Sequence, residues 1–243
     1  MTKLDGFDFG SVDEDFFNDP YPAYRALRNM SGPCHQPDGS VFVSRYDDIS
    51  KILGDYKNYS SDKTIDFKPK FGDGSLYEHH TTSMVFNDPP NHTRVRRLLT
   101  PFFTPRTLKA LESNMADMID ELVDEVEEKE NIDLVADFAI AIPLTLIGDM
   151  LGIPGDEREP LRAWATIILG ALEPALSQEQ LDIGNRAVED FKAYLKDLIV
   201  WKRGRLAKRE ETDILSTLLA NHDTADGLTE LELMHNCIFP LNA

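Results

Sequence analysis

A histidine and an arginine four positions apart mark the first candidate functional site of this 243-residue sequence. His92 and Arg96 would project from one face of a helix, where together they could grip a single anionic group. A surface helix that merely carries basic residues is the alternative, and the spacing alone does not separate the two interpretations. The helix is expected to begin at about Pro89, because Asp88 can cap its first turn and proline needs no N–H donor there.

The basic residues around this pair stand out in an acidic chain. Residues 89–111 contain no acid, whereas the whole sequence has 43 Asp and Glu against 25 Lys and Arg, a net charge of −18. The cations of this basic segment are Arg94, Arg96, Arg97, Arg106 and Lys109. Such a segment is expected where an acidic ligand or protein docks, because electrostatic steering needs a local field. The overall charge argues against nucleic acid or an anionic membrane as a partner.

The remaining histidines and cysteines give weaker patterns. His79 and His80 are adjacent, and without a supporting Cys or carboxylate spacing we expect them on the surface of a loop rather than at a metal. Cys34 and Cys237 form neither a disulfide framework nor a metal motif, which favours a reducing cytoplasm. We expect Cys34 to be a loop thiol and Cys237 a small core residue. The N-terminus has no apolar signal core, and the longest uncharged run, 138–148, is too short to span a bilayer.

Hydrophobic periodicity predicts a mainly α protein with about nine helices and one small N-terminal β-hairpin. The hairpin would turn at Pro37-Asp38-Gly39 and continue into the strand 40–43. We expect helices at 20–30, 46–54, 89 onward, 106–130, 133–151, 157–172, 178–208, 213–220 and 229–241. The helix at 133–151 is nearly all apolar and should be central, with Pro143 bending it.

The chain is expected to form one domain with three parts. Residues 1–60 would hold an irregular N-terminal arm, the hairpin and short helices, and 88–243 the helical part. Residues 61–87 have no period, and a loop of this length inside a compact domain is usually a lid or disordered. Scattered aromatic residues favour the lid.

The last predicted helix has a clear start. Thr229 and Glu232 form a capping box, and an apolar stripe follows through residue 241. Pro240 would kink this helix, because its ring displaces the preceding turn and it has no N–H to donate.

The run from Asp88 to Arg97, Asp-Pro-Pro-Asn-His-Thr-Arg-Val-Arg-Arg, is followed by Phe-Phe-Thr-Pro-Arg at 102–106. Together they resemble the C-helix signature of bacterial cytochrome P-450 enzymes, the haem-thiolate monooxygenases. The similarity covers essentially the whole sequence in order. It is carried also by residues 19–22, 41–49, 151–154, 213–216 and 228–233.

This resemblance implies a role for each candidate site. His92 and Arg96 would bind a propionate of haem b. The 61–87 loop would close over a small or medium apolar organic substrate, and the connection at 173–175 would form a second lid. The candidate lid residues are Phe67, Phe71, Tyr77, Met84 and Val85. A ferredoxin-type partner would deliver electrons at an outward face made by Arg94, Arg97, Arg106 and Lys109.

The resemblance also implies that 1–243 is a single incomplete domain, the N-terminal half of a soluble hydroxylating oxidoreductase that uses O₂ and is truncated in its central helix near Ala243. The family's Gly-x-acid-Thr segment, Glu-x-x-Arg pair and Cys-bearing iron-ligand loop have no counterpart here. We therefore expect that the chain alone does not catalyse the reaction. One alternative is a non-enzymatic helical module that binds an anion or haem. Another is a partly folded product in which the apolar stripe at 228–241 lacks partners.

Overall fold

The computed structural model describes residues 7–173, 176–206, 213–220 and 227–238, apart from the side chains of Ala110, Ser113, Ala136 and Leu206. Part of the predicted second lid at 173–175, together with Pro240 and Ala243, lies outside these residues. Two compact units make up the chain, Met1–Ser60 and Ser61–Ala243. The prediction of one single domain stays a prediction.

The first unit contains the predicted hairpin. Strands β1 (Cys34–His35) and β2 (Val41–Phe42) pair antiparallel. Gly39 turns the chain between them with φ +86°, a conformation that a residue without Cβ adopts at little cost. Three short helices accompany the strands: α1 (Glu14–Asn18), α2 (Tyr21–Arg28) and α3 (Tyr46–Gly54). Helix α1 and the 3₁₀ turn η1 (Phe9–Ser11) lie in the arm predicted to be irregular, and Cys34 lies buried on a strand rather than in a loop.

The second unit is built from helices and short connections. Its α-helices are α4 (Thr64–Phe71), α5 (Ser75–Thr82), α6 (Asn91–Leu99), α7 (Pro105–Glu127), α8 (Ala141–Leu151), α9 (Glu159–Gly170), α10 (Gln178–Leu206), α11 (Ile214–Ala220) and α12 (Glu230–Ile238). Single turns occur at η2 (Met84–Phe86), η3 (Thr100–Phe103) and η5 (Gly155–Glu157). The mainly α prediction is confirmed. Each predicted helix has a counterpart among the described residues, and α1, α4 and α5 are additional.

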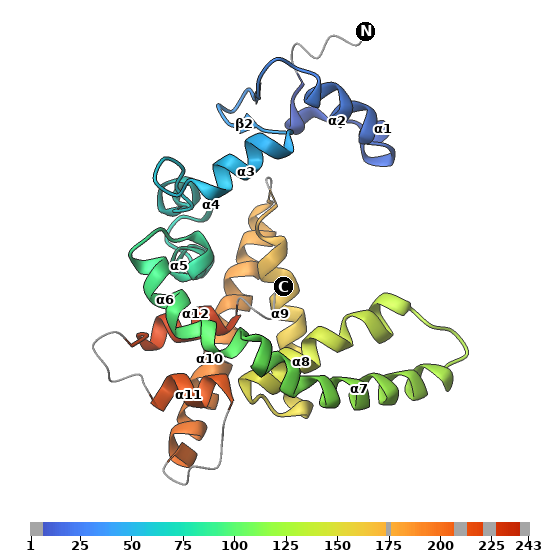
Figure 1. Ribbon diagram of the computed structural model, residues 1–243, viewed down its shortest axis with the longest axis vertical. Helices are drawn as coiled ribbons and strands as arrows, with labels where there is room; N and C mark the ends of the chain where they lie inside the picture. The colour runs from blue at the N-terminus through green and yellow to red at the C-terminus, as the bar shows by residue number, and fades with distance from the viewer. Residues whose placement is uncertain (1–6, 174–175, 207–212, 221–226, 239–243) are drawn as a thin grey trace. The chain divides into compact units, whose positions relative to one another are not determined.

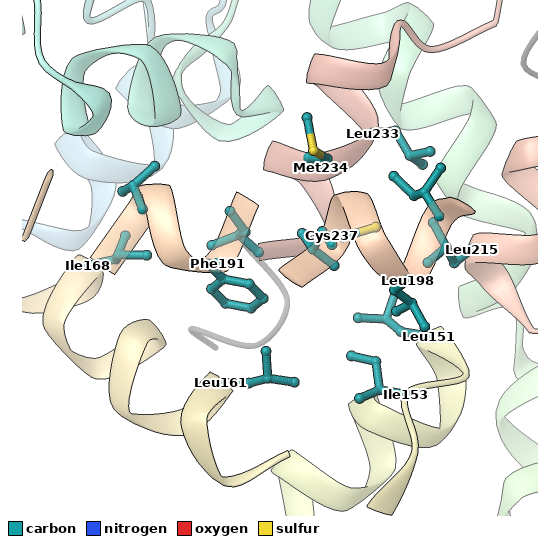
Figure 2. Close-up of a cluster of buried hydrophobic side chains, with 14 of the residues drawn as sticks. Leu151, Ile153, Leu161, Ile168, Phe191, Leu198, Leu215, Leu233, Met234 and Cys237 are labelled. Atoms are coloured by element: carbon teal, nitrogen blue, oxygen red, sulfur yellow. The ribbon is translucent and has the colours of Figure 1, made fainter. Parts of the chain in front are cut away.

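Helix α10 lies at the centre of the second unit, in contact with α5, α9, α11 and α12 (Figure 1). Its Phe191 is completely buried and packs against Trp164 of α9, with ring centroids 5.6 Å apart. Figure 2 shows Leu198 of α10 and Cys237 of α12 in the same apolar cluster. The apolar stripe of α12 is therefore covered over the described residues, and the prediction that it would lack partners is wrong there.

The apolar segment 133–151 differs from the predicted central helix. Residues Leu134–Ala139 form a π-helix, η4, and α8 begins only at Ala141. Leu134 and Val135 are 66% and 61% exposed, so apolar composition did not bring burial here. Pro143 lies in the first turn of α8, where a missing N–H costs no helical hydrogen bond.

Residues 61–87, predicted to be a loop without regular structure, contain α4, α5 and η2. Their sequence signals are poor, because α4 has Pro69 inside it and neither helix has a side-chain N-cap. Leu76, His79 and His80 of α5 are nevertheless buried. The Leu76 N–H donates to the Asn185 amide oxygen of α10 at 2.9 Å. The predicted surface position of the two histidines is wrong.

A buried histidine pair joins α5 to α12. The Nδ1 atoms of His79 and His235 lie 3.0 Å apart, and Nε2 of His235 lies 3.2 Å from the Glu78 carboxylate. Lys192 of α10 pairs with the same carboxylate. An ionised carboxylate only accepts, so His235 donates through Nε2. When both rings are neutral, His79 must then donate to Nδ1 of His235.

Burial keeps these rings neutral. Desolvation holds the pKa of His79 well below its usual value. Burial and then the charge of Lys70 lower the pKa of His80 to about 4. Burial also lowers the pKa of His235 to about 4, although Glu78 opposes this effect. The Nε2 atom of His80 is buried without a hydrogen-bond partner in the described part of the chain, so a proton there would gain no acceptor.

Replacing the central aromatic ring should destabilise the second unit strongly. Phe191→Ala is expected to lower the free energy of unfolding by about 3–5 kcal/mol, because it empties a site that is completely buried. Val200→Ala on the same helix is the matched control, since its side chain is 63% exposed, and its effect should stay within about 0.5 kcal/mol. Denaturant unfolding measures both, and equal effects would contradict the burial of Phe191.

Stability should also fall in mild acid. The folded pKa of His80, about 4, lies below its ordinary value of 6.5 in an unfolded chain, so the unfolded chain binds more protons between these two values. The contribution of His80 to the free energy of unfolding is complete above the unfolded pKa and is lost as the pH falls toward the folded pKa. For His80 the loss is on the order of 3 kcal/mol. Denaturant unfolding between about pH 7.5 and pH 4.5 tests this window.

A comparison of variants isolates the histidine from the carboxyl groups that titrate at lower pH. His80→Phe should remove the His80 share of the acid dependence, while His79 and His235 keep theirs. Phenylalanine fits among the rings of Phe67, Phe71 and Phe86 that surround this position. His35→Asn should leave it unchanged, because His35 is exposed. An unchanged acid dependence in His80→Phe would contradict the assignment.

Candidate functional site

Helix α6 carries the candidate anion-binding pair. It spans Asn91–Leu99, starting two residues after the expected Pro89, and the Asp88 carbonyl accepts the His92 N–H at 3.0 Å. The Asp88 carboxylate accepts the Ser61 N–H at 2.8 Å, which ties the approach to the helix to the start of the unit.

His92 and Arg96 lie one turn apart on α6, as their spacing predicted. His92 is half-buried and Arg96 is exposed. Neither side chain hydrogen-bonds or pairs with another described residue, and neither is among the residues with further contacts. Their N–H donors are therefore available to an outside acceptor. A carboxylate such as a haem propionate fits this pair, because Arg presents two parallel N–H groups and His a third.

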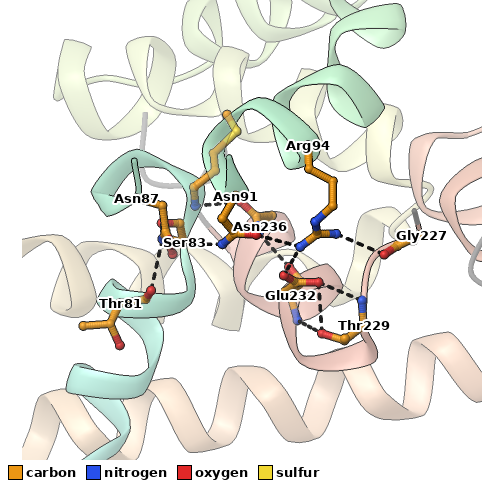
Figure 3. Close-up of polar contacts among 10 residues, drawn as sticks. Thr81, Ser83, Asn87, Asn91, Arg94, Gly227, Thr229, Glu232 and Asn236 are labelled. Atoms are coloured by element: carbon orange, nitrogen blue, oxygen red, sulfur yellow. Dashed lines mark hydrogen bonds and ion pairs between the residues drawn. The ribbon is translucent and has the colours of Figure 1, made fainter. Parts of the chain in front are cut away.

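Arg94 does not share that face of the helix. It donates to the Gly227 carbonyl at 3.0 Å and to Asn91 Oδ1 at 2.8 Å, and it forms an ion pair with Glu232 (Figure 3). Two positions along a helix correspond to a rotation of about 200°, so Arg94 faces α12 while Arg96 faces away from it. The structure thus differs from the prediction that Arg94 points outward, because an internal carboxylate holds it.

The other residues predicted for the outward face are exposed. Arg97 lies in the last turn of α6, and Arg106 and Lys109 lie in the first turns of α7. We refer to these three exposed cations, in a chain of net charge −18, as the positive surface.

The predicted lid residues fall into two groups. Phe67 and Phe71 of α4 pack around the His80 ring, with centroid distances to that ring of 5.6 and 5.3 Å. The Tyr77 hydroxyl donates to the Thr64 carbonyl at 3.1 Å. These three side chains hold α4 against α5. Met84 and Val85 lie further along the chain and have different surroundings.

Met84 lines an apolar cavity of about 260 Å³ in the second unit, whereas Val85 is not part of its lining and is 36% exposed. The walls include Leu99 from the end of α6, Ile147 from α8, Leu218 from α11 and Leu233 from α12. Such a cavity suits a small apolar molecule.

Asn236 is the amide in this apolar lining. Its Oδ1 accepts the Met84 N–H at 3.0 Å, and its Nδ2 donates to the Glu232 carbonyl at 2.8 Å. We did not predict a role for this residue. The available signal was a polar residue inside an apolar helical stripe, but its partner Met84 lies 152 positions earlier in the chain.

The two cysteines do not fit an iron-binding thiolate. Cys237 is buried on α12, and burial raises the pKa of its thiol to about 12, so it remains protonated. Cys34 is buried on β1 with its sulfur 3.8 Å from the Phe7 carbonyl. Over the described ranges, no group of three or more His, Cys, Asp or Glu could hold a metal ion. No helix in these ranges is both long and apolar enough to cross a bilayer.

The sequence and the fold both match known proteins. The family model for cytochrome P450 matches residues 34–243. Cytochrome P450 CYP107DY1 of Priestia megaterium is 31% identical over 250 residues, covering 96% of this chain and 59% of that protein. Cytochrome P450 monooxygenase PikC of Streptomyces venezuelae is 32% identical over 236 residues, covering 93% of this chain and 53% of that protein.

A similar solved structure is that of P450BioI in complex with hexadec-9Z-enoic acid ligated acyl carrier protein. It has a TM-score of 0.81 and 26% identity, covering 95% of this chain and 59% of that one. The chain thus spans between 53% and 59% of the length of these three relatives. The match to residues 34–243 places this chain in the cytochrome P450 family.

Proposed function

We propose that this chain is part of a haem-dependent monooxygenase that hydroxylates a small or medium apolar organic substrate, using O₂ and electrons from a ferredoxin-type partner. The observation that carries the proposal is the available His92–Arg96 pair on α6, in a chain of the cytochrome P450 family. The unpaired Cys34 and Cys237 thiols support a cytoplasmic location.

In this proposal α6 orients the cofactor. Arg96 and His92 donate to one propionate, which fixes the edge of the haem by charge-assisted hydrogen bonds. When bound, haem b supplies the redox-active iron for the O₂ chemistry. Because Cys237 is held protonated and Cys34 is buried on a strand, the iron ligand would come from neither, and this chain alone binds haem without turnover.

The apolar cavity beside Met84 supports an apolar substrate. The segment 61–87 would act as the lid, with Phe67, Phe71 and Tyr77 holding its two helices together and Met84 and Val85 at its end. Closing such a segment over a substrate excludes water from the reacting groups.

The non-enzymatic alternative, a helical module that binds an anion or haem, is favoured by one observation. The described residues offer a carboxylate grip, whereas Cys237, whose pKa is raised to about 12, offers no thiolate. This module would bind the same ligand at the same pair and would hold it without oxygen chemistry.

The purified chain should bind haem, and Arg96→Ala should weaken the binding by about threefold to tenfold, because one charged partner of the propionate is lost. Thr93→Ala, at an exposed position of the same helix, should have no effect. Titration followed by the Soret absorbance measures both. Failure of the wild-type chain to take up haem would overturn the proposal. A thiolate-type Soret band under carbon monoxide, with turnover, would contradict the inference that the iron ligand is missing.

The positive surface should bind an acidic ferredoxin. Replacing Arg106 and Lys109 together by Gln should weaken this binding and flatten its salt dependence, because two exposed charges are removed. Calorimetric titration between about 0.02 and 0.2 M salt measures the change. Lys196→Gln, at an exposed position of α10, is the matched control. An identical salt dependence in the double variant and the wild type would exclude this surface.

A further inference from the structure

Arg94 is anchored by acceptors from two separate segments. Within α6 it donates to Asn91. Outside α6 it contacts the Gly227 carbonyl, just before α12, and the Glu232 carboxylate of α12. The side chains of Arg94 and Glu232 are 27% and 15% exposed, so this ion pair is screened less than one on the surface. Because the guanidinium is a planar fork, contacts on several of its edges fix its direction as well as its position.

Glu232 is held as firmly from its own side (Figure 3). The carboxylate oxygen Oε2 accepts the Thr229 N–H at 2.9 Å and the Thr229 hydroxyl at 3.2 Å, while Thr229 Oγ1 accepts the Glu232 N–H at 3.2 Å. This is the predicted capping box, now confirmed. Because these hydrogen bonds tie the Glu232 carboxylate to the first turn of α12, the carboxylate cannot move with Arg94. It therefore anchors Arg94, and with it α6.

The 3.6-residue period of α6 then determines which way its other side chains point. Val95 is completely buried, and it follows Arg94 by about 100° around the helix axis. These two neighbours occupy the inward side of α6, which leaves His92 and Arg96 on the opposite side. Apart from the ion pair, α6 is held by the completely buried Val95 and by Leu98 and Leu99, which are only partly buried against the core.

We propose that Arg94 and Glu232 are positioning residues, which set the rotation of α6 and thereby aim the His92–Arg96 pair at its carboxylate ligand. This inference rests on the proposed function of that pair. The same turn of α12 also holds the cavity wall, because Asn236 binds both the Glu232 carbonyl and the Met84 N–H. The grip and the cavity are therefore positioned by one helix.

Two porphyrins separate positioning from general stability. Iron protoporphyrin IX carries two propionates, and its dimethyl ester has the same ring without the charges. The wild-type chain should bind the diacid about threefold to tenfold more tightly than the ester, and Arg96→Ala should bring this ratio to about one.

The same loss of preference for the diacid over the ester is expected in variants that leave His92 and Arg96 intact. Arg94→Gln and Glu232→Gln should each bring the ratio close to that of Arg96→Ala, measured by Soret titration of the full chain. Glutamine also suits the capping-box position, so Glu232→Gln keeps the start of α12. The double variant should lose no more than either single one, because both remove one interaction.

Two control variants should keep the ratio of the wild type. Thr104→Ala removes the N-cap of α7 and lowers stability without removing a contact of Arg94 or Glu232. Lys196→Gln removes an exposed cation of α10. If Arg94→Gln weakens both porphyrins equally and keeps the ratio, its role is merely structural and the inference is overturned. If Arg96→Ala keeps the ratio, the proposed function fails instead.

Discussion

The second unit depends on a set of polar side chains that α12 carries into the interior. His235 is completely buried, Asn236 is 4% exposed, and the Glu232 side chain is 15% exposed. Each has its partner on a different segment, namely α5, the turn η2 and α6. A buried polar group without a partner costs about 1–3 kcal/mol, so rotating α12 would cost several such terms at once. One helix therefore fixes three segments that lie far from it in sequence.

The cations of α6 in the basic segment have different surroundings because they lie on different faces of the helix. Arg94 is used inside the protein, while Arg96, two positions later, remains outside. A composition argument treats both as members of one positive patch. The structure separates them, because about 200° of rotation lies between two such positions and only one can face α12. Charge counted along a helix thus overstates what the helix offers to a partner.

Local signals predicted most of the helices, because caps, prolines and the 3.6-residue period act within a few positions. The capping box at Thr229 and Glu232 is the clearest case, and it is confirmed. Helix α5 was missed because a contact that stabilises it is distant: His79 meets a ring 156 positions away. Helix α4 packs against α5 and was missed with it. The inward position of Arg94 was missed for the same reason, because its ion-pair partner Glu232 lies 138 positions later in the chain. Apolar composition predicted burial where the structure shows exposure, as at Leu134. Hydrophobicity states which side chains favour burial but not what covers them.

The chemistry of α6 and α12 suggests how a cofactor would be held by this part of the protein. Arg96 is exposed, and an exposed ion pair contributes roughly 0–1 kcal/mol, which water and salt weaken further. An exposed Arg96 and a half-buried His92 would not by themselves retain a large ring. Their contribution is orientation, and most of the affinity must come from apolar contact between the ring and the protein. On the proposed function, the rotation of α6 would therefore matter more than the number of its cations. A weak grip that is aimed correctly selects one edge of the ring, whereas a displaced grip leaves the apolar contact without a preferred orientation.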